Sequence, residues 1–427
     1  MGLFAYILKI TKTNVFKDIS ILAGGNTLAQ LIGVLISPIL SRLYSPNDFG
    51  VVGSLLAFTG IVSLLGALKY DLAIIIERDN KKSKALLDLN IIIIVLVTII
   101  TSVGLFTSPY WLSYLDDKKE LTALLPYGAI VIFFSALFNT YYNRLNRDKD
   151  YKKMAISQII RRTTISLTQV IVGLFFASAF GLLLGNILGV VIPVLLLFVT
   201  KKSFSIYNHS SFLELRSIAK KYYKFALYTT PQSFINLLSA QMPIFVFGYF
   251  FSIEIVGVYF FTLKIVQVPA TFIGLSFRQV FYQKAAQMRE DLNGLKILYL
   301  KFTALLGSIM IIPMLLFFLF GESLFVILFG KEWALAGVFA GWMFLWYGSN
   351  VIAGPARSLY LVFEMQKRVF VLDSILFIFR LVSLILLSKY YASEIVIKWF
   401  SVFSLFFNLI VIIWWLNFFR IKLISNK

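Results

Sequence analysis

The sequence predicts an all-α membrane protein with about 12 transmembrane helices, in two pseudo-symmetric six-helix lobes around a central cavity. Of its 427 residues, 59% are hydrophobic and 14% are charged, whereas a soluble domain has about 25% charged residues. The apolar residues form continuous runs of roughly 20, the length that an α-helix needs to cross a bilayer. These runs do not alternate at a period of two, which argues against a transmembrane β-barrel.

The expected helices follow one another with short polar connections. Only residues 178–181 separate the fifth helix from the sixth, so a single re-entrant pair is the alternative interpretation there. In order, we expect helices at 19–43, 49–76, 84–108, 121–143, 156–178, 180–200, 222–248, 255–282, 297–321, 334–360, 368–388 and 396–419.

Lys and Arg are concentrated in alternate connections. If the N-terminus is inside, the inner segments hold 26 of the 40 basic residues and nine of the 20 acids, and the outer ones hold five basic residues and eight acids. Cytoplasmic loops accumulate Lys and Arg, so we expect both termini in the cytoplasm. The pI of about 9.8 reflects these loops, and nucleic-acid binding is not indicated.

Several classes of enzyme are excluded by composition. The chain has no Cys and one His, His209, which removes thiolate catalysis, histidine metal clusters and Ser-His-Asp triads. It also lacks the P-loop motif GxxxxGK[ST]. We therefore expect no enzyme activity, no cofactor and no metal site.

A repeated pattern divides the chain into two halves. The stretch Tyr44–Val51 and the stretch Phe251–Val258 each give an acid and then Gly-Val at the start of the next helix, about 207 residues apart. Acidic outer loops near a Trp also correspond, one at Trp111 to Glu120 and one at Glu332–Trp333. The repeat predicts lobes at 1–207 and 208–427, as in transporters built from parallel repeats. The second begins with an amphipathic helix at 208–224 lying on the inner membrane surface.

Two basic residues are expected deep within the membrane. Lys264 lies roughly 12 Å from the outer end of its helix, and Arg380 about 18 Å from the inner end of its own, at ~1.5 Å per residue. Gln267 shares a helix face with Lys264, and Asp373 shares one with Arg380, which it is expected to pair with. Ionisable groups at this depth usually face a bundle interior or a cavity.

Other polar residues lie within the helices, where helix-to-helix contacts are the competing interpretation. Arg161 and Arg162 are close enough to the inner surface to extend toward it. The remaining candidates are Lys69 and Asp71, and the amide-bearing stripes that include Asn26, Gln30 and Asn236. The nine basic residues and three acids that are counted with neither the inner nor the outer segments lie within the expected helices, a balance that would attract an anionic substrate.

These residues resemble the oligosaccharide flippases of the multidrug/oligosaccharidyl-lipid/polysaccharide exporter superfamily, which move O-antigen or polysaccharide repeat units. The likeness covers nearly the whole chain. It rests on Asn26–Gly50, Leu68–Ile76, Asn143–Arg147 leading into Ser157–Arg161, and Leu328–Trp333.

The resemblance implies a multi-pass protein of the bacterial cytoplasmic (inner) membrane. It would carry an undecaprenyl-diphosphate-linked repeat unit from the inner to the outer leaflet by alternating access. Lys264 and Arg380 would hold the diphosphate, and Lys69, Arg161 and Arg162 would form the entry. Asn26, Gln30, Asn236 and Gln267 would bind sugar hydroxyls, and Asp71 and Asp373 would couple transport to an ion. The implied partners are membrane lipids, a polysaccharide polymerase and a chain-length regulator, around a monomer.

Two other functions stay open. A cation-coupled multidrug exporter should carry buried acids with little opposing base, whereas the excess here is basic. A membrane-bound polysaccharide polymerase should present a large outer loop with catalytic groups, and the longest outer connection here, 108–121, is short.

Overall fold

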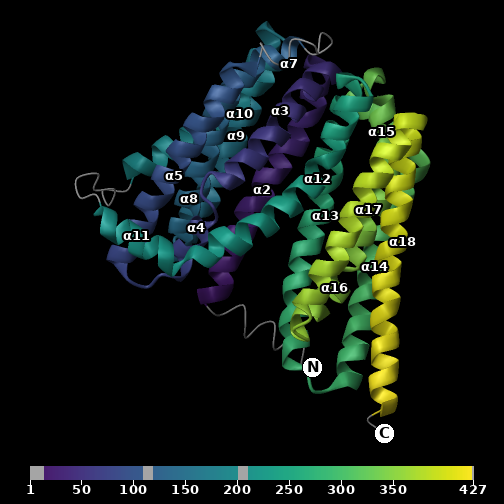
Figure 1. Cartoon of the computed structure of the whole chain (residues 1–427). Helices are drawn as coiled ribbons and strands as arrows, with labels where there is room; N and C mark the ends of the chain where they lie inside the picture. Colours follow the sequence, from purple (N-terminus) through teal and green to yellow (C-terminus); the bar gives the residue numbers. More distant parts are fainter. Residues whose placement is uncertain (1–13, 109–118, 201–209, 426–427) are drawn as a thin grey trace. The chain divides into compact units, whose positions relative to one another are not determined.

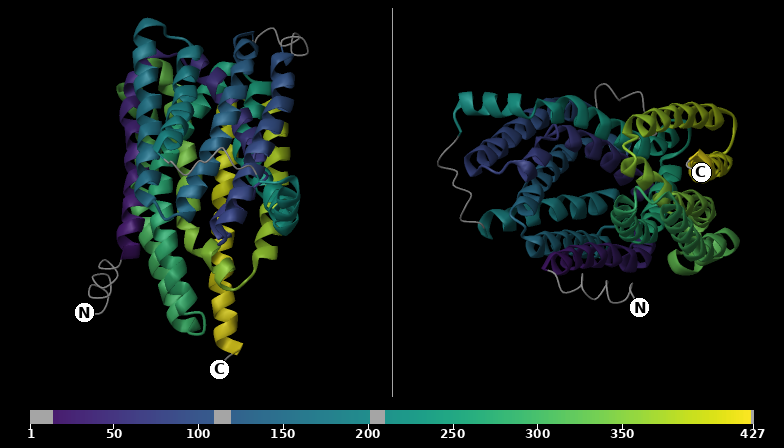
Figure 2. Two further views of the ribbon diagram at one scale, coloured as in Figure 1. Left: turned by 90° about the vertical axis from the view of Figure 1, so that its left-hand side faces the viewer. Right: turned by 90° about the horizontal axis from the view of Figure 1, so that it is seen from below.

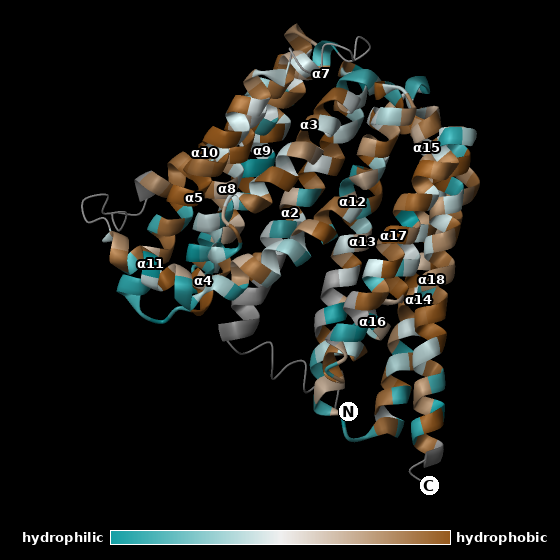
Figure 3. Cartoon of the chain, in the orientation of Figure 1, coloured by the Kyte–Doolittle hydropathy of each residue, from teal (hydrophilic) through white to brown (hydrophobic). Residues whose placement is uncertain are grey.

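The computed structural model describes residues 14–108, 119–200 and 210–425, and every regular element in those ranges is a helix (Figure 1). Eleven helical segments among them are long and apolar enough to cross a membrane. In Figure 3 the long helices are mainly hydrophobic, whereas hydrophilic residues gather at helix ends and around two short helices, α4 (Tyr70–Ile76) and α11 (Phe212–Lys221). The predicted all-α membrane fold is confirmed.

The fifth predicted span forms α9 (Tyr151–Phe175), which is too polar to count among those eleven segments. Its 25 residues extend roughly 37 Å, enough to cross the hydrocarbon core. Helix α10 (Ala179–Thr200) follows as a separate full-length helix. The re-entrant alternative for this part of the chain is therefore wrong.

The chain forms two compact units. Unit 1 runs up to Tyr44 and resumes over Val51–Gln241, and unit 2 consists of Ser45–Gly50 and the chain from Met242 onward. The six residues Ser45–Gly50, at the start of α3, thus belong to the second unit. The predicted repeat boundary at 207/208 is a statement about sequence correspondence and stays a prediction. The outer loop around Trp111 and His209 lie outside the described residues.

Unit 1 is built of helices that lie side by side in Figure 2. A core of buried residues joins α4, α5 (Asn80–Phe106), α8 (Gly128–Arg147) and α10, and Ile218 of α11 packs on it. In order, the other elements of unit 1 are α2 (Asn14–Leu43), most of α3 (Pro46–Leu65), α7 (Lys119–Leu124), η2 (Leu125–Tyr127), η3 (Phe225–Thr229) and the first half of α12 (Thr230–Phe250).

The second predicted span is interrupted, which corrects the continuous helix expected at 49–76. Helix α3 ends at Leu65, and α4 begins at Tyr70. Leu68 and Lys69 between them have φ values of 44° and 58°. Residues other than Gly rarely adopt this left-handed backbone conformation. Two such residues in succession end the helical hydrogen-bond pattern.

The basic hairpin after α8 is a structural connection. Arg147 donates hydrogen bonds to the carbonyl oxygens of Glu77 and Arg78, at 2.8 and 3.0 Å, and to Asn80 Oδ1 at 2.8 Å. Arg144 donates to Ser83 Oγ at 2.7 Å. The two arginines therefore fix the connection between α4 and α5.

Unit 2 holds the second half of α12 and the helices that follow. The tenth predicted span is broken at Ala353, where Pro355 sits in the first turn of the next helix, a position that tolerates a residue without an N–H. The elements are α13 (Ile253–Gln287), α14 (Leu292–Phe329), η4 (Lys331–Trp333), α15 (Ala334–Ile352), α16 (Gly354–Val362), α17 (Gln366–Tyr390) and α18 (Ser393–Ser425).

Glycines allow close helix contacts in unit 2. A Cβ placed on Gly337 would collide with the carbonyl oxygen of Gly321, and one on Gly341 would lie 2.8 Å from the carbonyl oxygen of Phe317. Gly337 and Gly341 are four residues apart, the spacing typical of tightly packed membrane helices. Helices α14 and α15 are therefore in backbone contact.

Candidate functional site

The predicted polar residues of unit 1 meet where α2, α8 and α9 are in contact. The Tyr142 hydroxyl shares hydrogen bonds with the side chains of Asn26 and Gln158. Gln30 lies one turn further along α2 and is half-buried. The first amide stripe is thus joined to the hairpin motif of α8 and α9.

The paired arginines of α9 point to different neighbours. Arg161 is half-buried, and its guanidinium carbon lies 5.0 Å from the ring centroid of Phe138. Arg162 is exposed, and its Nη1 lies 3.9 Å from where a Cβ on Gly33 of α2 would be. Arg161 is stabilised by an aromatic face, while Arg162 lies beside a position of α2 that has no side chain.

Asp71 is buried directly after the α3–α4 interruption. Its side chain is 5% exposed, and Oδ2 accepts a hydrogen bond of 2.8 Å from Asn143 Nδ2. Among the described residues, Oδ1 is buried without a hydrogen-bond partner. Lys69, in the left-handed conformation, is half-buried two residues earlier. A buried carboxyl with one unsatisfied oxygen is costly unless a proton or another donor reaches it.

Lys264 of α13 lies against aromatic rings in unit 2. Its Nζ is 4.5 Å from the ring centroid of Phe260 and 5.4 Å from that of Phe49. Phe49 in turn packs edge-on against Phe261 and Trp333, with centroids 5.2 and 5.3 Å apart. The ammonium group is half-buried and held by aromatic faces.

Arg380 of α17 lies against aromatic rings and a Ser hydroxyl. Its Nη2 donates a hydrogen bond of 3.0 Å to Ser404 Oγ, and its guanidinium lies 5.4 and 5.8 Å from the ring centroids of Phe400 and Trp346. Its Nε is buried with no acceptor among the described residues. A guanidinium has five donors, and here one of the buried ones still lacks an acceptor.

A polar network near Arg380 is missing from the sequence-based candidates. Asn408 of α18 donates hydrogen bonds of 2.9 and 3.0 Å to Ser349 and Asn350 of α15, and it accepts one of 3.5 Å from Arg357. Arg357 Nη1 also lies 3.9 Å from Asp373 Oδ1. Asp373 therefore has Arg357 as its ion-pair partner, and it is also close enough to Arg380 to interact with it electrostatically.

The two remaining amides differ in their surroundings. Gln267 donates a hydrogen bond of 3.0 Å to the Tyr347 hydroxyl, and Tyr347 is close enough to Arg380 to interact with it electrostatically. Asn236 is exposed on α12 and has no hydrogen bond within the described part of the chain. Gln267 thus belongs with the polar groups of unit 2, and Asn236 stands apart from the other candidates.

The candidates form two sets, one in each unit, and both include cations that lie against aromatic rings. Unit 1 holds Asn26, Gln30, Lys69, Asp71, Arg161 and Arg162, and unit 2 holds Lys264, Gln267, Asp373 and Arg380. In the described ranges, no group of three or more His, Asp or Glu could hold a metal ion.

Comparisons with solved structures show a transporter fold. The lipid II flippase MurJ, in an inward closed conformation, matches with a TM-score of 0.73 and 11% identity, over 93% of this chain and 87% of MurJ. A multidrug resistance MATE transporter in an inward-facing conformation gives 0.63 and 14%, over 93% and 95%. A MOP superfamily transporter from Pyrococcus furiosus gives 0.61 and 13%, over 95% of each chain.

At these identities the likeness shows the fold alone, and the sequence matches no curated protein. A family model described as polysaccharide biosynthesis protein matches residues 39–336. That match takes in more than half of the chain, and the fold is that of the MOP superfamily transporters. The protein therefore belongs to the polysaccharide biosynthesis protein family.

Proposed function

We propose that this membrane transporter moves a polyprenyl-diphosphate-linked oligosaccharide repeat unit from the cytoplasmic to the outer leaflet by alternating access. The substrate would be an undecaprenyl-diphosphate carrier bearing an O-antigen or other polysaccharide repeat. The membrane would be the bacterial inner membrane, with both termini in the cytoplasm. The family match to polysaccharide biosynthesis supports the substrate class.

The observation that carries the proposal is the state of Arg380. This guanidinium lies against Phe400, Trp346 and a Ser hydroxyl, and one of its donors is buried without an acceptor. Leaving a buried charged donor unpaired costs more than a neutral one. An anionic oxygen would complete the site, and guanidinium groups bind phosphate oxygens especially well.

Lys264 fits the same role, since it lies on the faces of Phe260 and Phe49. Lys264 and Arg380 would hold the diphosphate in mid-membrane. Lys69, Arg161 and Arg162 would receive the head group at the cytoplasmic entrance. The amides of Asn26, Gln30, Asn236 and Gln267 would offer hydrogen bonds to sugar hydroxyls.

Asp71 suits a proton carrier better than Asp373. Asp71 is almost fully buried with one oxygen lacking a partner, whereas Asp373 lies beside Arg357 with a side chain 44% exposed. Protonation would remove a buried charge at Asp71. We infer that a proton on Asp71 couples transport to the proton gradient.

The structural relatives are consistent with this function. MurJ is a lipid II flippase. For the Pyrococcus furiosus transporter, a reversed polarity of the binding pocket suggests a different function, so charge sign can separate substrate classes within the fold. The basic excess in this chain favours an anionic substrate over a cationic drug. A polysaccharide polymerase, a chain-length regulator and membrane lipids would be its partners, around a monomeric protein.

Deletion of the protein tests the proposal. Cells that lack it should accumulate lipid-linked repeat units on the cytoplasmic leaflet and lose the surface polymer, and the intact gene should restore both. Normal surface polysaccharide in the deletion strain, with no accumulated intermediate, would contradict the proposed function.

A further inference from the structure

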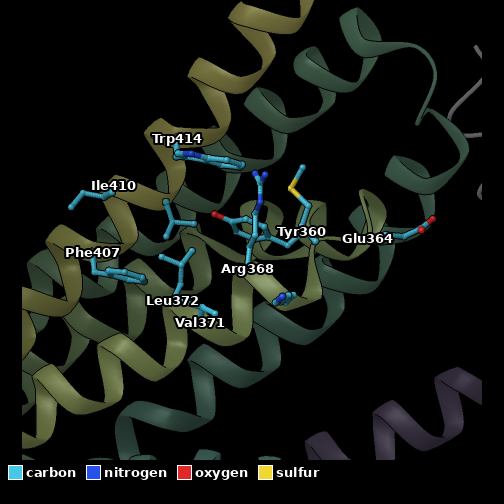
Figure 4. A pocket seen from close by; sticks show the side chains of 11 residues that line it. Tyr360, Glu364, Arg368, Val371, Leu372, Phe407, Ile410 and Trp414 are labelled. Atoms are coloured by element: carbon cyan, nitrogen blue, oxygen red, sulfur yellow. The ribbon is translucent and has the colours of Figure 1, made fainter.

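A pocket lies within unit 2 between α16, α17 and α18 (Figure 4). Its volume is about 670 Å³, within the ~300–1,000 Å³ of typical small-molecule sites. It involves none of the residues proposed above for the oligosaccharide. The lining residues are Tyr360, Glu364, Met365, Lys367, Arg368, Val371, Leu372, Phe407, Ile410, Val411 and Trp414.

Two helical stripes form the apolar walls. Phe407, Ile410, Val411 and Trp414 recur at the i, i+3, i+4 and i+7 positions that share one face of α18. Val371 and Leu372 are one turn beyond Arg368 on α17. Ile410 and Val371 are exposed, at 62% and 46%, as residues facing acyl chains would be. The walls are suited to a hydrocarbon chain.

Two basic residues line the pocket. Lys367 and Arg368 lie in the first turn of α17 and are exposed, and the described residues give neither an ion pair. Glu364 is the acid among the lining residues, but it points away from the pocket (Figure 4) and Arg289 Nη1 lies 2.8 Å from its Oε1. The acid is thereby neutralised, and the two cations remain available.

The pocket therefore combines two cations with apolar walls. Lys367 lies at the start of α17, next to a connection that is expected on the cytoplasmic side. Basic pockets between membrane helices on that side bind anionic lipid head groups. We propose that this pocket binds an anionic phospholipid of the inner leaflet. The headgroup phosphate would lie on Lys367 and Arg368, with an acyl chain between α17 and α18.

Two other anions fit the pocket less well. Inorganic phosphate would leave the stripe from Phe407 to Trp414 in contact with water. An oligosaccharide diphosphate would need many hydrogen-bond partners, whereas the walls offer chiefly aliphatic and aromatic side chains. An amphiphile with one phosphate uses both parts of the pocket.

The experiment measures lipid binding to the purified full chain in detergent by native mass spectrometry, with dioleoyl phosphatidylglycerol as the probe. Each cation removed should weaken binding about fivefold, so K367Q/R368Q should weaken it roughly 25-fold. The matched control is R420Q, which removes an exposed arginine from the last part of α18 and should leave binding unchanged.

A second variant separates the pocket from general surface charge. V371W keeps every charge but fills the space between the apolar walls at an exposed position, and it should also weaken phosphatidylglycerol binding. Dioleoyl phosphatidylcholine should bind the wild type and K367Q/R368Q alike.

Three results would overturn the proposal. In the first, R420Q weakens binding as much as K367Q/R368Q; in the second, V371W has no effect. In the third, undecaprenyl phosphate or inorganic phosphate displaces phosphatidylglycerol at equal or lower concentration. Because the readout is binding, these results are independent of whether the protein transports an oligosaccharide.

Discussion

Gly50 and Gly257 pack against each other at equivalent positions of the repeat, 207 residues apart, at the starts of α3 and α13. A Cβ on Gly257 would lie 2.7 Å from the Gly50 amide nitrogen, and one on Gly50 would lie 3.1 Å from the Gly257 nitrogen. Each would also collide with a carbonyl oxygen four residues before the other glycine, at Ile253 and Pro46. The contact is reciprocal, and it brings Phe49 against Lys264.

Alanine at Gly50 or Gly257 should destabilise the protein by about 1–3 kcal/mol, because the new methyl group meets backbone that cannot rotate away. Thermal unfolding in detergent, followed by size-exclusion chromatography after heating, measures this. The matched control is G60A in the same helix, where nothing lies within 4 Å of the added Cβ. An unfolding temperature for G50A equal to that of G60A would disprove the close contact.

The pH dependence of α11 docking follows from Glu77. Burial by itself would raise the pKa of Glu77, but hydrogen bonds from Lys221, the Asp79 backbone N–H and Tyr222 outweigh it and lower the pKa to about 2. Lys221 Nζ lies 2.5 Å from Glu77 Oε2, and the same bond raises the pKa of Lys221. A lowered carboxyl pKa stabilises the folded state above the ordinary value of 4.5 and loses that effect as pH falls toward 2.

Hydrogen exchange of the α11 amides should therefore stay constant from pH 8 to 5, after correction for intrinsic rates, and increase below about 4.5. In E77Q the exchange should already be faster at pH 7, with little further change on acidification. Equal protection of α11 in E77Q and the wild type at pH 7 would contradict the role of this ion pair.

The absence of Cys from the chain allows a direct test of topology. A Cys at Glu332, in the connection after α14, should react with an impermeant maleimide added to intact cells. A Cys at Lys149, between α8 and α9, should react only after the membrane is opened. The reverse pattern would reject cytoplasmic termini.

The D71N variant should uncouple transport from the proton gradient, because the amide cannot carry a proton at the buried site. The rate in vesicles should then no longer respond to an imposed pH difference. D373N should keep the response, since Asp373 is ion-paired with Arg357. If D71N responds to the gradient as the wild type does, Asp71 is not the carrier.

The helices could be predicted because a helix that crosses the bilayer has a simple sequence pattern, a long apolar run between polar breaks. The structure ends α5, α10 and α12 within a few residues of the predicted bounds. Gly66 follows the last residue of α3, but the interruption itself could not be predicted, because Leu68 and Lys69, which have the positive φ values, are of types that rarely adopt them. It follows from the packing of α4 in the unit 1 core.

The candidate site shows the same division. Depth within a run identifies Lys264 and Arg380, since a charge there is unusual whatever surrounds it. The ion-pair and hydrogen-bond partners could not be predicted in the same way, because helices far apart in sequence supply them. Asp373 shares a helix face with Arg380 but pairs with Arg357 from α16, and Asn408, in the middle of an apolar run, joins a network that only the packing of α15 and α18 creates.

The central claim is that buried cations select an anionic lipid-linked sugar, and a reconstituted flipping assay tests it most directly. Proteoliposomes would carry an undecaprenyl-diphosphate oligosaccharide in the inner leaflet, and its arrival outside would be read by an external glycosidase. K264Q and R380Q should each slow flipping about tenfold or more, the effect of losing one charge-assisted hydrogen bond, while K389Q, at the exposed end of α17, should not. Flipping at the wild-type rate in the K264Q/R380Q double variant, with each protein folded, would contradict the account.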